Sequence, residues 1–302
     1  MAKITEYIKN IFLLLVLIQF LPFLFNNFRS IVKDIFEPKT KIGLISINSP
    51  IFSSDYYTKE LQRNFKNPDI KAIVLHFKNA PGGTAGAGQV IHMQLKELKK
   101  MFVKPILAVV EDTCGSAAYY IASATDYIIA APSSDVGSIG VYIARPQLKD
   151  FIEQFKIKYD VTQAGEYKTT GNPLLPITQP QLEMLQKITD DCYEQFVSDV
   201  AQSRPKLSKN TKEWADGKIF TGRQGLKIGL VDELGTLLSA EKILKDKLLI
   251  KGDIEWIKPE SAGFIGTLFG HESEESKNFN ALSWLPIIVQ TLMQHDYKSQ
   301  SV

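Results

Sequence analysis

A serine in a run of small residues is the first candidate for chemistry in this sequence. The apolar segment PILAVV is followed by EDTCGSAAYYIA, which brings Ser116 to the junction between a predicted strand and a predicted helix. A hydroxyl at the start of a helix lies near unpaired amides and the positive end of the helix dipole, where developing negative charge is stabilised. Ser116 is therefore a candidate nucleophile. Glycine, serine and alanine are also common where a buried helix begins, so the motif alone leaves a packing role open.

A double glycine follows an earlier apolar segment. KAIVLHF ends shortly before APGG, which contains Gly82 and Gly83. Glycine lets the backbone approach a ligand without a Cβ atom, and amides in such a loop can stabilise an oxyanion. Because ligands gather at the carboxyl ends of strands in an open parallel sheet, the two glycine-containing turns are predicted to share one crevice.

A serine nucleophile needs a general base, and the histidines are poor candidates for it. They are His76, His92, His271 and His295. The first lies in a predicted buried strand, the second in a helix rich in solvated lysines, and the other two in the C-terminal tail. A lysine can replace histidine when desolvation lowers its pKa toward neutrality. Lys168, in GEYKTTGNP, lies among small and uncharged residues and fits that role, whereas most lysines of the chain are predicted to be exposed charges.

The cysteines do not point to a metal or a disulfide framework. Cys114 and Cys192 are too few for either. Cys114 is a weaker candidate nucleophile, because no histidine is predicted nearby and a small buried cysteine is ordinary. No cofactor is expected. With 35 basic and 33 acidic residues, the chain also has no charge excess that would indicate nucleic-acid binding.

The elements around these residues alternate between strand and helix. Strands are predicted at 41–47, 71–77, 105–110 and 126–131, with helices between them. This order predicts an α/β fold with a parallel sheet and crossover helices. Further along, Thr178 and Gln181 form a capping box that starts a long amphipathic helix ending near residue 203. Another helix is predicted at about 237–249.

The N-terminal region is predicted to be a membrane anchor. The segment from Ile11 to Phe25 is interrupted only by Gln19 and Pro22, and it approaches the length of a membrane-spanning helix. NNFRSIVKDIF follows it instead of the small residues of a cleavage site, so an uncleaved anchor is favoured over a removable signal peptide. The flanking charges do not set its orientation.

Five motifs together resemble one known family. PGG, GSAAYYIASATDYIIAAPSSDVGSIGVY, GEYKTTGNP, DDCYEQFVSDVA and ADGKIFTGRQGLKIGLVDELG occur in the order and at the intervals of the signal peptide peptidase A family of bacterial membrane-anchored serine proteases. The likeness covers roughly Lys41 to Leu249. The 52 residues between Ser116 and Lys168 equal the family's spacing between nucleophile and general base.

The resemblance implies roles for five residues. Ser116 resembles the nucleophile and Lys168 its base, and the amides of Gly83 and Ala117 correspond to the oxyanion hole. Ser138, in GSIG, corresponds to a serine that supports the lysine. The family usually has Ser-Gly-Gly-Tyr-Tyr after the nucleophile, whereas this chain has Ser-Ala-Ala-Tyr-Tyr, and Ala80 replaces the serine that usually precedes Pro-Gly-Gly. The amide at residue 117 can still donate if its φ need not be positive, although the added methyl groups would narrow the substrate pocket.

The resemblance also implies an architecture and a setting. The expected fold is that of Clp protease and crotonase. The chain is expected to form a homo-oligomeric ring in which the serine and the lysine of one site come from different copies, and eight is one candidate number of subunits. The expected substrates are remnant signal peptides, with other membrane or mislocalised proteins as further candidates. The expected location is the bacterial cytoplasmic membrane, with the catalytic domain on its extracytoplasmic side.

The predicted organisation is a cytoplasmic stub (1–10), a transmembrane anchor (11–28), a linker (29–40), a protease domain (41–258) and an interfacial or partly disordered tail (259–302).

Two other functions stay open. A crotonase-like acyl-CoA enzyme would use the glycine-rich loop to polarise a carbonyl, but it would leave Ser116 and Lys168 without a joint purpose. An inactive membrane-anchored scaffold of the same fold would explain the Ser-Ala-Ala departure.

Overall fold

The computed structural model describes residues 18–23, 25, 39–250 and 252–259. Most of the predicted anchor and almost all of the C-terminal tail lie outside this part. The described residues of the anchor, 18–23 and 25, are helical. No helix within the described ranges is long and apolar enough to cross a bilayer.

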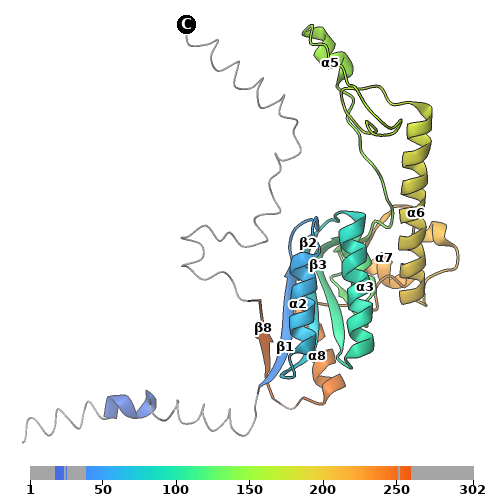
Figure 1. The fold of residues 1–302 in the computed structure, drawn as a ribbon. Helices are drawn as coiled ribbons and strands as arrows, with labels where there is room; N and C mark the ends of the chain where they lie inside the picture. Colours follow the sequence, from blue (N-terminus) through green and yellow to red (C-terminus); the bar gives the residue numbers. More distant parts are fainter. Residues whose placement is uncertain (1–17, 24, 26–38, 251, 260–302) are drawn as a thin grey trace, which may run out of the picture.

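An eight-stranded sheet forms the centre of the described chain (Figure 1). Its order is β6-β5-β3-β2-β1-β8, with β4 paired to β3 and to β7. All pairs are parallel except β5 with β6. The strands are β1 (Thr40–Ile47), β2 (Ile70–Ala80), β3 (Ile106–Gly115), β4 (Tyr127–Ala130), β5 (Asp135–Gly137), β6 (Ile219–Thr221), β7 (Glu233–Leu234) and β8 (Ile254–Ile257).

Helices cover both faces of the sheet, and α5 lies away from it. The helices are α2 (Asp55–Lys66), α3 (Ala85–Met101), α4 (Ala117–Ser123), α5 (Lys149–Gln154), α6 (Gln179–Ser203), α7 (Gly222–Ile228) and α8 (Leu237–Leu248). The packing of β3 shows the layers: Ile106, Ala108 and Val110 face the core shared with α2, α3 and α4, whereas Leu107 and Val109 face α8. Because side chains alternate along a strand, burial on both faces produces the continuous apolar runs in the sequence.

The four predicted strands are therefore confirmed, and β3 continues five residues beyond its predicted end, through Gly115. The extension is polar in its middle, so an apolar run alone could not reveal it. Strands β5, β6 and β8 were not predicted, because segments of three or four residues carry little periodicity. Strand β7 is only two residues long and likewise was not among the four predicted strands.

Helix α6 is confirmed with its capping box, but its apolar face is only partly core. Phe196 and Val200 are buried, whereas Leu182 and Ile188 near its start are exposed. The chain between β5 and α6 forms an arm that projects from the sheet and carries α5 at its far end (Figure 1). The predicted face of α6 therefore leaves an open apolar surface beside this arm.

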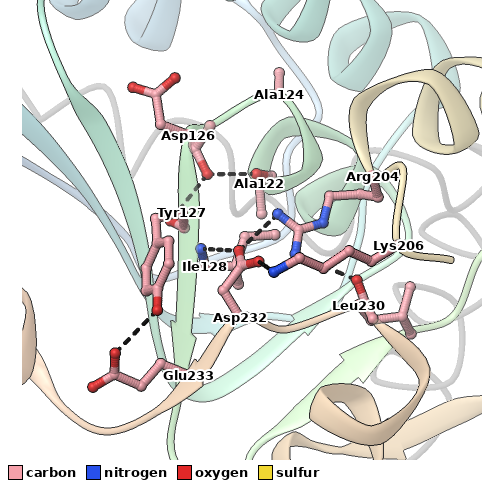
Figure 2. A network of polar contacts seen from close by, with 12 residues as sticks. Ala122, Ala124, Asp126, Tyr127, Ile128, Arg204, Lys206, Leu230, Asp232 and Glu233 are labelled. Carbon is pink, nitrogen blue, oxygen red and sulfur yellow. Dashed lines mark hydrogen bonds and ion pairs between the residues drawn. The ribbon is translucent and has the colours of Figure 1, made fainter.

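A buried ion pair fastens the C-terminal end of α6 to the sheet (Figure 2). Arg204 lies 2.8 Å from the carboxylate of Asp232, and both side chains are less than a tenth exposed. The same carboxylate accepts the amide of Ile128 in β4 at 2.9 Å. Arg204 also donates to the carbonyl of Gly229. Lys206 approaches the other carboxylate oxygen at 3.8 Å from an exposed position.

Asp232→Asn should lower the free energy of unfolding by about 3–5 kcal/mol, because it leaves the Arg204 charge buried without its counter-ion. Lys206→Ala touches the same carboxylate from solvent and should cost less than about 1 kcal/mol. Urea unfolding of the two variants beside the wild type measures both values. An equal loss of unfolding free energy in the two variants would show that the strength of these ion pairs does not depend on their burial.

Candidate active site

Ser116 occupies a strained junction between β3 and α4. Its φ is 51° and its ψ is −123°, a conformation that costs a non-glycine residue about 1–3 kcal/mol. Two hydrogen bonds hold it: the Ser116 amide donates to the carbonyl of Gly137 at 2.8 Å, and the Ser116 carbonyl accepts the amide of Tyr120 at 2.9 Å. A sharp strand-to-helix turn with a serine at its apex is the geometry of a nucleophile elbow.

The glycine pair lies directly against this junction. A Cβ atom at Gly82 would lie 3.1 Å from the Cβ atom of Ser116, and one at Gly83 would lie 2.0 Å from the carbonyl oxygen of Ile51. Ile51 holds the loop by donating to Gly82 and accepting from Thr84. These bonds leave the Gly83 amide without an acceptor among the described residues, so it is free to donate to a ligand.

Ala117 presents a second free amide. The first hydrogen bond within α4 runs from Tyr120 to Ser116, so the Ala117 amide has no partner inside the helix. Among the described non-glycine residues, positive φ occurs at Ser116, Ser138, Lys156 and Leu249, but not at Ala117. Alanine is therefore compatible with the backbone here.

The methyl groups of Ala117 and Ala118 are accommodated by the packing around them. Ala118 is fully buried, so its methyl group does not narrow a substrate pocket. Gly88 of α3 packs against Ala117, since a Cβ atom at Gly88 would lie 2.9 Å from the Ala117 methyl carbon. Glycine at this position of α3 thus provides the space that the methyl group of Ala117 occupies.

Ser116, Gly83 and Ala117 line one cavity of about 690 Å³. Its walls come from the loop after β1, the start of α3, α4, the beginning of the arm and the middle of α6. The other lining residues are Phe52, Thr84, Ala85, Gly86, Gln89, Tyr120, Gly140, Val141, Tyr142, Ala144, Cys192, Gln195 and Phe196. No ionisable acid or base of the Asp, Glu, Lys, Arg or His type is among them, so the cavity suits an uncharged group.

The two remaining predicted residues have different positions. Ser138, with φ of 50°, packs against the junction: a Cβ atom at Gly115 would lie 3.4 Å from the Ser138 Cβ atom. Lys168 is exposed in a turn of the arm, where its amide donates to the carbonyl of Gly165 at 3.2 Å. It is not among the residues that line the Ser116 cavity. One chain therefore brings together Ser116, Gly83, Ala117 and Ser138, and holds Lys168 in a separate segment.

Cys114 is fully buried two residues before Ser116. Burial raises the pKa of its thiol, which opposes formation of the nucleophilic thiolate. The described part of the chain contains no cluster of three or more His, Cys, Asp or Glu side chains that could hold a metal ion.

His92 lies in the predicted lysine-rich helix, but the burial of its own side chain was not predicted. Its side chain is fully buried, its Nδ1 lies 2.8 Å from the carbonyl of Tyr120, and its ring packs on the Tyr120 ring. Tyr120 in turn donates to Asp199 at 2.5 Å, behind the cavity wall. The spacing of Gly88, His92 and Leu95 on one helical face could have indicated burial. His76 is buried as expected, with Nε2 2.9 Å from an oxygen of Glu111.

Comparison with known proteins identifies the family. The sequence profile of peptidase family S49 matches residues 99–251. A candidate protease of Methanocaldococcus jannaschii is 34% identical over 216 residues, which cover 71% of this chain and 68% of the relative. The chain belongs to peptidase family S49. This is the signal peptide peptidase A family that the motifs resembled, and its mixed α/β sheet agrees with the fold expected for that family.

Two further relatives carry informative names. A candidate signal peptide peptidase A of Enterococcus faecium is 27% identical over 255 residues, covering 80% of this chain and 74% of the relative. Protease 4 of Haemophilus influenzae is 25% identical over 272 residues, but these cover 84% of this chain and only 44% of that protein. Membership of S49 and these names support a serine peptidase.

Gly83→Ala should disturb the S49 site, because the new methyl group would meet the Ile51 backbone. We expect a loss of about 1–3 kcal/mol in the free energy of unfolding and a marked loss of peptidase turnover. Gly86→Ala is the matched control for stability, since no atom lies within 4 Å of a Cβ atom there. Urea unfolding compares the stability of the two variants, and hydrolysis of an unfolded protein measures the turnover of Gly83→Ala. An equal loss of stability in both variants would contradict the close approach at Gly83.

The S49 domain should lose stability below neutral pH. Burial lowers the pKa of His92 from 6.5, with a smaller opposing contribution from its bond to Tyr120. Burial also lowers the pKa of His76, partly offset by Glu111. A lowered pKa means that the unfolded chain binds protons more readily, so stability is complete above pH 6.5 and falls as the pH drops toward the folded-state pKa.

His92→Asn keeps a donor for the Tyr120 carbonyl and removes the titration. It should therefore reduce the change in urea midpoint between pH 7.5 and pH 5.5. If the urea midpoint of this variant changes with pH as much as that of the wild type, His92 is not the source of the pH dependence.

Proposed function

We propose that this chain is a membrane-anchored serine endopeptidase in which Ser116 is the nucleophile and Lys168 the general base. One observation carries the proposal: Ser116 is held at positive φ between β3 and α4, in a cavity that it shares with the free amides of Gly83 and Ala117. Strain of this kind persists where the surrounding structure imposes it, and it is concentrated at functional sites.

The mechanism follows from these groups. Neutral Lys168 accepts the Ser116 proton, and the alkoxide attacks the carbonyl carbon of the peptide bond. The Gly83 and Ala117 amides donate hydrogen bonds to the oxyanion, and protonated Lys168 returns the proton to the departing amine. A water molecule, deprotonated by the same lysine, then hydrolyses the acyl-enzyme and regenerates Ser116. The hydroxyl of Ser138 holds the amine in position.

The base is proposed to come from a second copy of the chain. Lys168 is exposed in the arm and absent from the walls of the cavity in its own chain. Insertion of the arm into a neighbouring subunit would bury the amine and lower its pKa, as its function requires. Repetition of this contact around a ring gives each subunit a complete site, with eight subunits as one candidate number.

The proposed substrates are remnant signal peptides, with other membrane or mislocalised proteins as further candidates. The uncharged cavity suits the apolar side chains of such peptides, and two of the relatives are named as signal peptide peptidase A and protease 4. The proposed location is the bacterial cytoplasmic membrane, with an anchor at residues 11–28 and the catalytic domain on the extracytoplasmic side.

A serine-directed fluorophosphonate should label Ser116 in the wild type. Ser116→Ala should abolish labelling, and Lys168→Ala should slow it by at least about 100-fold, since general-base catalysis contributes about 10²–10⁴-fold. Mass spectrometry of the labelled peptide identifies the site. Rapid labelling in Lys168→Ala would exclude the dyad, and labelling at another serine would exclude the nucleophile.

Complementation distinguishes a shared site from one within a single chain. Ser116→Ala and Lys168→Ala should each be inactive, but subunits unfolded together and refolded as a 1:1 mixture should recover about a quarter of wild-type activity, because random assembly pairs the two intact residues at that frequency. Refolded wild type provides the reference. A mixture without activity, beside an active refolded wild type, would place both residues of the dyad in one chain.

A further inference from the structure

The end of the sheet opposite the Ser116 cavity has an unusual surface. The strands β1, β2 and β3 begin there, since Lys41 pairs with Ile70 and Ile73 pairs with Ile106. Helices α2, α3 and α8 end at the same place (Figure 1). We call this end the basal face. It consists of the start of β1, the turns at 67–69 and 102–105, and residues 249–250 and 252–253, with the last residues of the three helices.

Apolar side chains stand at the tips of two basal turns. Val103 is fully exposed, Leu249 is 84% exposed and Met101 is 71% exposed. They are three of the five most exposed large hydrophobic residues in the described part of the chain. Leu249 also has a φ of 53°, a conformation in which leucine is rare. Single exposed apolar residues are normal on a protein, but three at one end indicate a contact.

Lysines surround these tips. Within the described ranges, four exposed lysines of the basal face have no carboxylate at ion-pair distance: Lys66, Lys71, Lys100 and Lys247. Other basic groups there are neutralised, as Lys41 is by Asp69 and Lys99 by Asp126. Asp246 and Asp253 are also exposed at this end. The unpaired lysines outnumber these acids, so the face has a net positive charge.

Lys104 differs from the surrounding lysines because it is part of the fold. Its ammonium group donates to the carbonyls of Asn64, Phe65 and Asn67 at the end of α2. It therefore holds the turn at 102–105 against the turn at 67–69. The turn that carries the exposed Val103, next to Lys104, is therefore held in a fixed position.

We propose that the basal face rests on a lipid bilayer with anionic headgroups. Apolar tips enter the boundary between headgroups and acyl chains, while the lysines contact the negatively charged surface. The short distance along the chain between the apolar N-terminal run and the basal face agrees with a membrane as the partner. Strand β1 begins at Thr40 on the basal face, and only 14 residues (26–39) separate it from Phe25, where the apolar run of the sequence ends. The contact is independent of the peptidase chemistry.

The experiment compares full-length protein in detergent, in phosphatidylcholine vesicles and in vesicles that also contain phosphatidylglycerol. A membrane-permeant reagent acetylates the lysines, and mass spectrometry gives the rate at each one. Lys66, Lys71, Lys100 and Lys247 should react at least about threefold more slowly on anionic vesicles than in detergent, and 0.5 M salt should reduce that protection. Lys149 on α5 and Lys187 on α6 are controls whose rates should not change.

Serine variants test the apolar tips. The triple variant Met101→Ser, Val103→Ser and Leu249→Ser should lose at least half of the protection. Leu238→Ser should retain it, because Leu238 is 74% exposed but lies at the opposite end of α8. Equal rates on neutral and anionic vesicles would overturn the proposal. Protection that rises with protein concentration in detergent would also overturn it, since a second copy of the chain would then cover the face.

Discussion

The close approach of backbone segments around Ser116 is the constraint on which the site depends. Strand β3 must end with Ser116 at positive φ, and three glycines allow neighbouring segments to reach it. Gly82 passes beside the serine, Gly115 makes room for Ser138, and Gly88 admits the methyl group of Ala117. A methyl group at any of these positions would meet atoms of the junction or its support, so close packing around Ser116 maintains its strained backbone conformation.

Much of the fold could be predicted from the sequence, because its strongest patterns come from burial. Strands β1, β2 and β3 have apolar residues on both faces, and α6 begins with an explicit capping box. The missed elements lack such patterns. Strand β5 is three residues long and owes its position to pairing with the end of β3. Strand β8 joins the edge of the sheet beside β1, although Ile254 lies more than 200 residues after Thr40. Long-range pairing of short strands leaves little trace in local sequence.

The candidate site was predictable to the extent that its groups come from neighbouring strand ends. Ser116 and Gly83 follow β3 and β2, which are adjacent, so a parallel sheet brings them together. The network of His92, Tyr120 and Asp199 was missed because it joins α3, α4 and α6, whose relative placement is set by tertiary packing. Lys168 is exposed in the arm that projects from the sheet, so strand order does not predict which residues lie beside it.

The polarity of a parallel sheet separates the two ends of this molecule. Ten residues of β3 lead from the turn beside Val103 to the residue before Ser116, a rise of about 33 Å at 3.3 Å per residue. If the basal face rests on a membrane as proposed, the Ser116 cavity lies above the lipid by about the thickness of the bilayer's hydrocarbon core, ~30 Å. A peptide still embedded in the bilayer would have to thread about ten extended residues into water before its first bond could be broken. On this geometry, the proposed site reaches only those peptide segments that have already left the lipid.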